Sequence, residues 1–443
     1  MGLPLGAYGP LKNGGVMQVV TYNFGSRCLA TLLAASAGCG MAFAADIPER
    51  TAPLGPVGVV ERPRRDYDAL GYRSGNFIFY PSLISSATYD DNVFASRFQR
   101  VDDIVFHLIP QVTASGDFGT TAVSGYVNAD GRLYARRTEL NSVSPNIGVG
   151  FKSQIQRDLV VIGRADYGYK VEDPGDTQRL SGAGVIHGLV RYHDLNTSLS
   201  VNKDFGSFFL SAGTAYEHLA YNNIRDTTGA LVRENRRDAD LVTWTLRGGA
   251  TIGPGLKVFV EPSANIKRYN ASGFDSNGFR VVSGLSTEIG RLVTGEIYAG
   301  YTSQIYDRAF GTVSGFTAGG NVRWFPTQLL TITLKADRTI QDSGVTQGVG
   351  IGSPYFVTSV SGRADYELLR NLILTGSVGY QNSDYQRNAA RTDNVYNTGA
   401  TMTYLFNRFI SGSLDYKYTK SYSTVATSRY DRNQYTASVK GQF

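Results

Sequence analysis

The chain is poor in the residues that mark several common classes of protein. Its 443 residues include 2 cysteines, 4 methionines, 2 tryptophans and 4 histidines. Both cysteines, Cys28 and Cys39, lie in an N-terminal stretch that we expect to be removed on export. A mature chain without thiols would have no disulfide, no thiolate metal site and no cysteine nucleophile.

The composition also argues against membrane helices and nucleic-acid binding. Each spanning helix needs roughly 20 consecutive apolar residues, and a mean hydropathy of −0.18 is too low for a bundle of such helices. The net charge is +6, but the bases are spread thinly and mark no binding module, so nucleic acid is not an expected partner. Glycine, with 51 residues, and tyrosine, with 28, are abundant, which favours a β-barrel.

Residues 1–45 are predicted to be a signal peptide. Arg27 precedes an apolar run over residues 28–41, which leads to Ala42-Phe43-Ala44, an A-x-A cleavage pattern. The run is too short for a spanning helix. Met17 is a candidate for the true start, which would leave a compact signal. We therefore expect export.

An alternative for this segment is a lipoprotein acylated on Cys39. The three residues before it, Ser36-Ala37-Gly38, lack the large aliphatic side chain that such signals carry three positions upstream. This departure favours the signal peptide.

Residues 46–74 are predicted to be a flexible segment on the periplasmic side. Proline-rich stretches of this kind are extended and act as linkers. A tether is the first interpretation, and a contact site for a periplasmic partner is the alternative. The residues that suggest it are Pro48, Pro53, Pro56, Pro63, Arg62, Arg64 and Arg65.

From residue 75 onward, apolar and polar side chains alternate. In residues 241–252, 329–339 and 409–420, nearly every second residue is apolar or small and its neighbours are polar. Successive side chains of a strand point to opposite faces, so each segment has one apolar and one polar face. The segments run to about 11–15 residues, whereas soluble strands average ~5–6 and tilted membrane strands need ~9–11 in the apolar band alone.

Aromatic residues and connections also follow the pattern of a membrane barrel. Aromatic side chains gather near strand ends, as in the girdles at the membrane surface. Short connections alternate with longer polar ones, and in barrels the short turns lie on the periplasmic side. Over residues 75–443 we predict an all-β fold, a transmembrane antiparallel up-and-down β-barrel of about 18 strands, or 16 if one weak pair merges. The predicted girdle residues are Tyr380, Tyr396, Tyr404, Tyr416, Tyr418 and Trp324.

The last alternating segment is predicted to be an assembly signal. Tyr435, Ala437, Val439 and Phe443 share one face, and Phe443 is the final residue. Outer-membrane barrels commonly close with such a strand, which resembles the signal read by the barrel-assembly machinery. The expected location is the outer membrane of a Gram-negative bacterium, with membrane lipid and this machinery as partners.

Three short motifs suggest a family. They are Gly-Asn-Phe-Ile-Phe-Tyr-Pro-Ser-Leu at residues 75–83, Tyr-Asp-Asp-Asn-Val-Phe at residues 89–94, and Asp103-Ile104 leading to Ile109-Pro110. With them the chain resembles the putative beta-barrel porin 2 family over about residues 70–443. The resemblance implies an outer-membrane barrel without catalytic residues. Some relatives sit beside polysaccharide synthesis and export systems, which makes periplasmic polysaccharide-export proteins candidate partners.

Candidate chemical sites are weak, and we predict no enzyme activity, cofactor or metal. The histidines His107, His187, His193 and His218 are scattered, whereas a zinc site needs clustered ligands. No G-x-S-x-G elbow accompanies the serines and histidines. Asp90-Asp91-Asn92 could hold Ca²⁺, but Asp and Asn also favour turns, which is the interpretation we prefer.

The polar faces are the most informative set of side chains, and we expect them to line the lumen. A charge on the lipid face would cost about 2–4 kcal/mol at the midplane. Eleven bases against seven acids indicate a wall that tolerates water and mildly favours anions. A salt-bridged wall that keeps the barrel rigid is the alternative. The predicted bases are Arg132, Arg164, Lys170, Arg247, Lys257, Lys267, Arg323, Lys335, Arg363, Lys417 and Lys440, and the acids are Asp130, Asp166, Glu261, Glu296, Asp337, Asp365 and Asp415.

The sequence therefore predicts a porin-like channel for passive diffusion of small polar solutes, with anions as candidates. Barrels of 16–18 strands are wide enough for an aqueous channel. Two alternatives stay open. One is an exit pore for an exopolysaccharide that works with periplasmic export proteins, and the other is a non-conducting barrel that serves as an envelope anchor or adhesin. The oligomeric state is not predicted.

Overall fold

The protein is described by a computed structural model that covers residues 57–175, 189–225, 229–271, 273–289, 292–307, 310–343, 353–386 and 391–443. The predicted signal peptide and His187 lie outside these residues. Among the residues covered, no helix has the length and apolar character needed to span a membrane.

Strands dominate the chain, and three short 3₁₀ helices lie in the connections. The helices are η2 (Thr138–Leu140), η3 (Glu234–Arg237) and η4 (Ala426–Ser428). The strands are β1 (Tyr72–Ser74), β2 (Phe77–Asp90), β3 (Asp103–Asp117), β4 (Thr121–Tyr134), β5 (Ser142–Gln156), β6 (Leu159–Val171), β7 (Arg191–Asp204), β8 (Phe208–Tyr221), β9 (Ile224–Arg225), β10 (Leu231–Val232), β11 (Ala239–Gly253), β12 (Leu256–Tyr269), β13 (Ser276–Ile289), β14 (Val293–Tyr306), β15 (Thr312–Thr327), β16 (Leu330–Asp342), β17 (Pro354–Leu369), β18 (Leu372–Tyr385), β19 (Thr392–Leu405), β20 (Ile410–Ser423) and β21 (Tyr430–Gln442).

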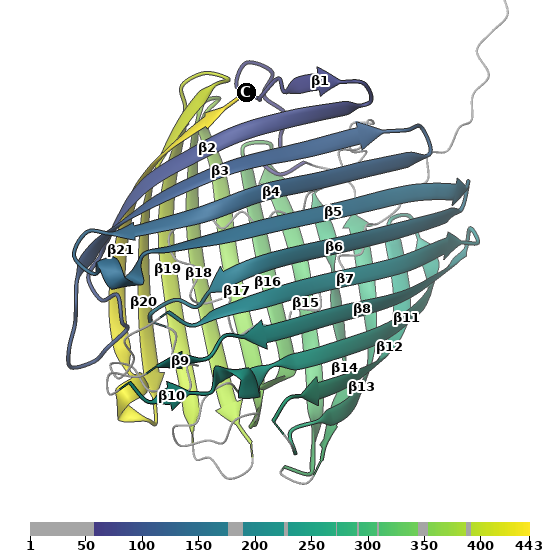
Figure 1. Cartoon of the computed structure of the whole chain (residues 1–443). Coiled ribbons are helices and arrows are strands. Elements are labelled where there is room, and N and C mark those ends of the chain that lie inside the picture. The colour runs from purple at the N-terminus through teal and green to yellow at the C-terminus, as the bar shows by residue number, and fades with distance from the viewer. Residues whose placement is uncertain are drawn as a thin grey trace, which may run out of the picture.

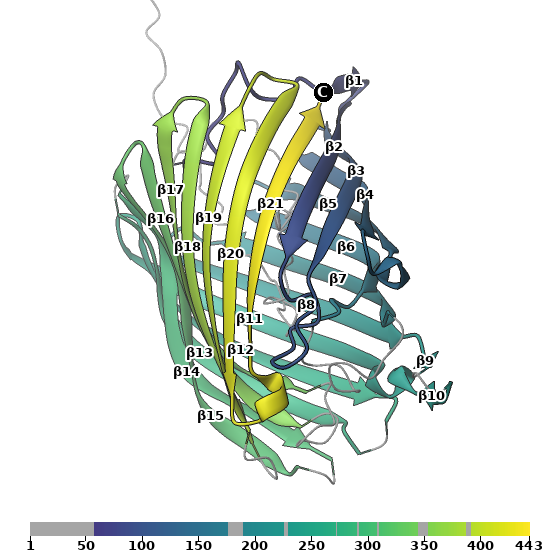
Figure 2. The same ribbon diagram turned by 90° about the vertical axis from the view of Figure 1, so that its left-hand side faces the viewer.

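Eighteen of the strands, β2 to β8 and β11 to β21, form one closed antiparallel barrel. Each pairs with the next along the chain, and β2 pairs with β21 to close the ring. Figure 2 shows this closure, with the purple β2 beside the yellow β21. Each strand has 13 to 16 residues. The predicted fold class and strand number of 18 are thereby confirmed.

The two ends of the barrel differ in their connections. At one end the strands are joined by two to four residues, as at Arg157 and Asp158 between β5 and β6. The other end carries the longer connections, among them those with β9, β10 and the 3₁₀ helices (Figure 1). Since short turns face the periplasm in such barrels, we call these the periplasmic and the outer end.

The two faces of the sheet have opposite character. On β3, Ile104, Phe106 and Leu108 are 43%, 48% and 49% exposed. His107, which lies between Phe106 and Leu108, is buried, and so is Gln111 farther along the strand. The exposed apolar side chains of the other strands lie on the same face, so the outer surface is apolar. The predicted girdle residues also occupy outer-face positions. Trp324 and Tyr404 lie near strand ends, whereas Tyr380, Tyr396, Tyr416 and Tyr418 lie four to six residues from the nearer strand end.

Aromatic rings and glycines alternate on the inner face of six neighbouring strands. Phe209, Phe259 and Tyr298 stand directly opposite glycines in the ladders of β8, β11, β12, β13, β14 and β15. A Cβ atom on Gly249 would lie 2.4 Å from Cζ of Phe209, and one on Gly284 would lie 2.5 Å from Cζ of Phe259. On Gly319 it would lie 2.4 Å from the Tyr298 hydroxyl. Each ring therefore fills the place of the side chain that the glycine lacks.

The barrel wall overlaps itself between β15 and β16. Their ladder runs from Thr327 opposite Leu330 to Gly319 opposite Asp337 and stops there. Beyond this point the hydroxyl of Thr317 donates to the carbonyl of Arg338 at 2.5 Å. The ring of Phe356 on β17 lies 3.0 Å from the place of a Cβ on Gly315. In its outer half, the β16–β17 hairpin therefore lies inside β15.

Candidate functional site

The inner face of the barrel is the candidate functional site. Register positions put every predicted pore-lining side chain on this face, opposite the exposed apolar side chains. That these side chains line an open path stays a prediction. Lys335, Lys417 and Lys440 occupy inner positions on β16, β20 and β21.

Ion pairs and hydrogen bonds join most of the predicted residues, so the wall is extensively salt-bridged. Asp337 accepts a hydrogen bond from Tyr298 and Asp415 accepts one from Ser413. Lys257 lies over the ring of Phe209. The ion pairs are Arg132 with Asp130, Arg164 with Asp166, Lys170 with Asp194, Arg247 with Glu261 and Glu296, Lys267 with Asp342, Arg323 with Glu61, and Arg363 with Asp365.

Arg247 is the centre of the tightest of these groups. Its side chain is 8% exposed, its Nε donates to Glu261, and its Nη1 donates to Glu296 at 3.0 Å. The guanidinium carbon lies 4.1 Å from the centre of the Phe259 ring. Arg280 of β13 also approaches Glu261, at 3.6 Å. A buried charge is stable only when it is paired, and these pairs place both signs of charge side by side on the wall.

The outer end of the lumen is narrowed by the connection between β6 and β7. Asp173 of this connection accepts from Nη1 of Arg432 on β21 at 3.3 Å, although β2 to β5 separate β6 from β21 in the sheet. The Nε of Arg432 also donates to both oxygens of Asp90, at 3.0 and 2.9 Å. Burial acts to raise the pKa of Asp173, but the charges of Arg432 and Arg132 outweigh it and lower that pKa below its ordinary value.

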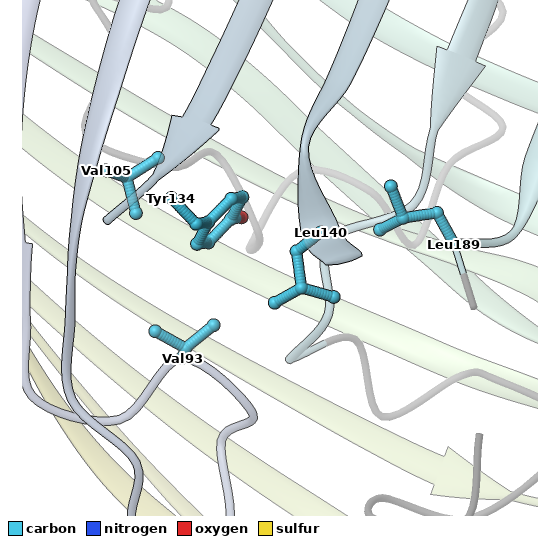
Figure 3. Packing of buried hydrophobic residues seen from close by; sticks show 5 residues of the cluster. All are labelled: Val93, Val105, Tyr134, Leu140 and Leu189. Atoms are coloured by element: carbon cyan, nitrogen blue, oxygen red, sulfur yellow. The ribbon is translucent and has the colours of Figure 1, made fainter. Parts of the chain in front are cut away.

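An apolar cluster holds the same connection in place. Val93, Val105, Tyr134, Leu140 and Leu189 are buried together (Figure 3). Leu189 precedes β7, Val93 follows β2 and Leu140 lies in η2, so three outer connections pack against the inner face of β3 and β4. The connections fold inward because lumen-facing tyrosine and valine give them apolar surface to cover.

A second ion cluster lies beside this connection. Arg237 of η3 donates to Glu172 at 2.6 Å and to Glu234 at 3.1 Å. Its guanidinium carbon lies 4.1 Å from the centre of the Tyr221 ring. Burial acts against the charge, but the nearby Glu172 and Tyr221 raise the pKa of Arg237 well above its ordinary value. The charged arginine thus ties the β6–β7 connection to the one between β8 and β11.

At the periplasmic end, residues 57–71 form a strap across the mouth. The amide of Val59 donates to the Thr331 hydroxyl of β16 at 2.9 Å, and Arg64 donates to Glu367 of β17 at 3.1 Å. Farther on, Gln442 of β21 donates to the carbonyl of Tyr67 at 3.1 Å. The strap therefore runs from β16 and β17 to β21, past β18 to β20, and is seen at the top of Figure 2.

This strap differs from the flexible tether predicted over residues 46–74. Val59 is fully buried, and the side chains of Arg64 and Glu367 are 7% and 8% exposed. Arg62 also donates to Glu367, at 2.9 Å. The arginines that suggested a solvated linker bind a carboxylate some 300 positions away, which composition alone does not reveal.

Sequence reasoning missed several charged residues of the inner face, most of them carboxylates. Several lie near the outer ends of strands, and the period-two alternation extended by a few positions would have found them. With them the inner-face residues named here are thirteen bases and thirteen acids, so the excess of positive charge that the sequence predicted is cancelled. The missed acids are Asp90, Asp103, Asp194, Glu217, Glu367 and Asp393, and the missed bases are Arg280 and Arg432.

The residues of the predicted assembly signal lie on the outer face beside the closing seam. Tyr435 packs between Tyr416 and Tyr89, with ring centres 4.9 and 6.5 Å away. The ring of Phe443 stacks on Phe409 at 6.2 Å. Ala437 and Val439 follow Tyr435 on the same face of β21. Their recognition by the assembly machinery stays a prediction.

No metal or catalytic set emerges from the residues that the structure covers. His107 contacts Asp130 on the inner face at 3.1 Å, whereas His218 contacts Asp240 on the outer face at 2.8 Å. Within the covered ranges no three His, Asp or Glu side chains gather in a way that could hold a metal ion. Asp90 instead accepts from the amide of Asn92 at 3.0 Å, as in an Asx turn.

Several solved outer-membrane channels are similar to this chain. Pseudomonas aeruginosa OccK2 (OpdF), solved in complex with glucuronate, is 11% identical with a TM-score of 0.46, over 82% of this chain and 98% of that chain. Pseudomonas aeruginosa OpdL is 11% identical with a TM-score of 0.43, over 83% and 99%. Acinetobacter baumannii OccAB2 is 15% identical with a TM-score of 0.43, over 84% and 99%. At such identities the likeness concerns the fold alone.

Family membership rests on a different comparison. No curated protein matches the chain. The family model for putative beta-barrel porin 2 matches residues 64–443, which include all eighteen barrel strands. The family and the closed barrel both point to an outer-membrane channel rather than an enzyme. The chain therefore belongs to the putative beta-barrel porin 2 family.

Proposed function

We propose that the barrel is a channel for passive diffusion of small polar solutes across the outer membrane. The observation that carries the proposal is the charged and hydrogen-bonding inner face, which faces away from the apolar outer surface at every strand. A wall of this kind can exchange contacts with water and with hydrated solutes. The inward connections at the outer end and the strap at the periplasmic end would limit the size of what passes.

A mild preference for anions is the finer part of this proposal. The predicted bases outnumber the predicted acids on the inner face, but carboxylates such as Asp90, Asp194 and Glu367 offset them. We therefore expect any preference for anions to be weak, since selectivity follows the net field along the path.

Single-channel recording of the purified protein in planar bilayers tests both parts. Steady small-ion conductance is expected, and a salt gradient should give a small reversal potential of the sign for anions. Lys417→Glu on the inner face should shift this potential toward cations. Lys420→Glu, three positions along β20 and on the outer face, is the matched control and should leave it unchanged. Silence of the wild-type protein under all conditions would refute the channel.

The strap supports a second candidate, an exit pore for an exopolysaccharide. A polymer could pass the periplasmic mouth only after residues 57–71 move aside, and a periplasmic export protein could displace them. In that case the purified protein would conduct only after such a partner is added. A barrel that stays silent with and without the partner would instead fit an envelope anchor or adhesin.

A further inference from the structure

The sequence Gly-Arg-Ala-Asp-Tyr occurs twice in the chain, at residues 163–167 and 362–366. The first copy lies in β6 and the second in β17. In each copy the arginine and the aspartate occupy inner-face positions, and the tyrosine, Tyr167 or Tyr366, is exposed on the outer face. The repeat therefore puts the same pair of charges on the lumen wall in two places.

The two copies stand on opposite walls of the barrel. Counted from β2, β6 is the fifth and β17 the fourteenth of the eighteen barrel strands, so they are nine positions apart in either direction around the ring. In Figure 1, β6 belongs to the near wall and β17 to the far wall. Arg164 is the sixth residue from the periplasmic end of β6 and Arg363 the seventh from that of β17, so the two arginines lie at a similar depth.

Each aspartate is held by its arginine and by a hydroxyl group of another strand. Nε of Arg363 donates to both oxygens of Asp365, at 2.9 and 3.0 Å. The Thr375 hydroxyl of β18 donates to the same carboxylate at 2.6 Å. Asp166 likewise accepts from Nη2 of its arginine at 2.9 Å and from the Tyr126 hydroxyl of β4 at 2.8 Å. Contacts of this kind fix the orientation of the arginine that the acid binds.

Within both pairs the arginine is more exposed than its acid. The side chain of Arg363 is 51% exposed and that of Asp365 is 9% exposed. The corresponding values for Arg164 and Asp166 are 38% and 21%. Three other inner-face pairs are closed, with no side chain more than 11% exposed, namely Arg247 with Glu261, Lys267 with Asp342, and Arg432 with Asp90. At the two repeats a solute in the lumen would therefore meet mainly the base, although acids and bases on the wall are equal in number.

An exposed guanidinium beside a less exposed acid is suited to bind an oxyanion. Its N–H donors form a planar fork that matches two oxygens of a carboxylate or phosphate group. In Arg363 the acid takes Nε and Nη2, the latter at 2.9 Å, so Nη1 lies on the side away from the acid. Lys170 is also more exposed than its partner Asp194, at 39% against 2%, but an ammonium group is a point charge without this fork.

We propose that Arg164 and Arg363 are two docking points, on facing walls, for the carboxylate or phosphate group of a small anionic solute that passes through the barrel. Asp166 and Asp365 are positioning residues that orient the two guanidinium groups. Each point binds on its own, because the two stand half a ring apart. This inference deepens the proposed diffusion channel and rests on it for any effect on transport.

Binding is tested with succinate as the probe, by saturation-transfer difference NMR on the full-length protein in detergent, which requires no conductance. The wild-type protein should give succinate signals. Arg164→Gln and Arg363→Gln should each lower these signals, and the double variant should lower them several-fold, because independent points add. Absence of succinate signals with the wild-type protein, or wild-type signals with the double variant, would refute the docking points.

The matched control is Arg136→Gln, which removes the same charge at the outer end of the barrel. Arg136 is 69% exposed and pairs with Asp102, so exposure and an acidic partner are both kept while the position changes. This variant should leave the succinate signals unchanged. A decrease equal to that of Arg363→Gln would mean that any exposed arginine binds the probe, and would overturn the proposal.

The double variant Arg164→Lys/Arg363→Lys separates the fork from the charge. It keeps both positive charges, but a lysine does not bind two oxygens in the fixed geometry of a guanidinium, so most of the succinate signal should be lost. Signals equal to those of the wild type would rule out the fork. Inorganic phosphate should displace succinate from the wild-type protein more than chloride does at the same ionic strength, and equal displacement would reduce the effect to screening.

Recordings in planar bilayers test the effect on transport. Succinate added to potassium chloride should lower the chloride current through the wild-type channel and leave that through the double glutamine variant unchanged. A wild-type current that does not respond to succinate would show that the docking points lie off the path. If the wild-type protein never conducts, the proposed channel fails, and the NMR signals alone still decide whether the two arginines bind. Retention of the folded band on an unheated gel confirms that each variant is intact.

Discussion

At the scale of single residues, the aromatic rings of the inner wall are held from two sides. A glycine of the neighbouring strand lies beneath each ring, and a cation lies over it. The guanidinium of Arg280 stands 4.8 Å from the centre of the Tyr298 ring, and the amine of Lys257 stands 5.5 Å from that of Phe209. Cation–π contacts of this kind contribute about 0.5–2 kcal/mol each. Here they also hold the charged groups of Lys257 and Arg280 close to the barrel wall.

Replacing one of the covered glycines should destabilise the barrel. In Gly249→Ala the new methyl group would lie 2.4 Å from Cζ of Phe209 and 2.3 Å from the carbonyl oxygen of Val258. Overpacking of this kind costs about 1–3 kcal/mol. We expect a lower temperature for loss of the folded band in unheated gel samples.

The matched control for this prediction is Gly376→Ala, since nothing lies within 4 Å of a Cβ at that position of β18. Its melting temperature should be unchanged or slightly raised, because alanine restricts the unfolded chain more than glycine does. An equal decrease in melting temperature in both variants would mean that the contact with the Phe209 ring does not cause the destabilisation.

Residue faces were predictable where the alternation was regular. The sequence placed Arg164 and Asp166 on one face of a strand because they stand two positions apart, and the structure joins them. It did not assign Asp194, which lies near the start of β7. Cross-strand partners such as Arg247 and Glu296 could not be predicted, since they depend on contacts between strands far apart in sequence.

At the scale of elements, ion pairs hold the strap against the barrel wall. Glu367 accepts from both Arg62 and Arg64. In Glu367→Ala these arginines lose their shared partner, so the strap should leave the mouth more often. Trypsin should then cut faster after Arg64 or Arg65 in the folded protein.

Glu139→Ala is the control for the strap, because Glu139 pairs with Arg137 at the outer end of the barrel. It should leave tryptic cleavage of the strap unchanged. A strap that is equally resistant in wild type and in Glu367→Ala would show that the two ion pairs do not hold it.

The β6–β7 connection should respond to acid. The pKa of Asp173 is lowered in the folded protein, so its contribution is complete above the ordinary carboxyl pKa of ~3.9 and is lost as pH falls through the lowered value. Exchange of the Glu172 amide, which donates to the carbonyl of Val190 at 2.9 Å, should therefore speed up, relative to an unstructured peptide, only at strongly acid pH. Asp173→Asn should show the faster exchange already at neutral pH, and equal exchange in the two proteins at neutral pH would contradict this role.

The elements themselves were predictable because each strand is long and alternates regularly. The segments that fold into the lumen or across its mouth could not be predicted from the sequence. The strap, the β6–β7 connection and the overlap at β15 all depend on pairs such as Arg64 with Glu367 and Asp173 with Arg432. Such pairs produce no local sequence pattern, because each partner taken alone looks like an ordinary charged residue of the surface.

At the scale of the whole molecule, the barrel depends on keeping charge away from lipid. Val378, in the middle of β18, is 61% exposed on the outer face, and its neighbour Ser377 lies on the inner face. Val378→Arg should cost about 2–4 kcal/mol in the membrane. We expect a lower yield of folded protein on refolding into lipid vesicles.

Ser377→Arg introduces the same side chain one position away, into the lumen. Its refolding yield should stay close to that of the wild type. If the two variants refolded equally well, the assignment of faces for the whole barrel would be wrong.

The aromatic contacts and the overlap together make the wall mechanically uneven. The rings of Phe209, Phe259 and Tyr298 link β8 and the strands β11 to β15 to one another in a continuous row. That row ends at Gly319, the same residue at which the ladder to β16 stops. A sector braced by ring contacts thus borders an interruption of the ladder, so we expect thermal fluctuation of the outer rim to concentrate at one angular position instead of spreading around the circumference.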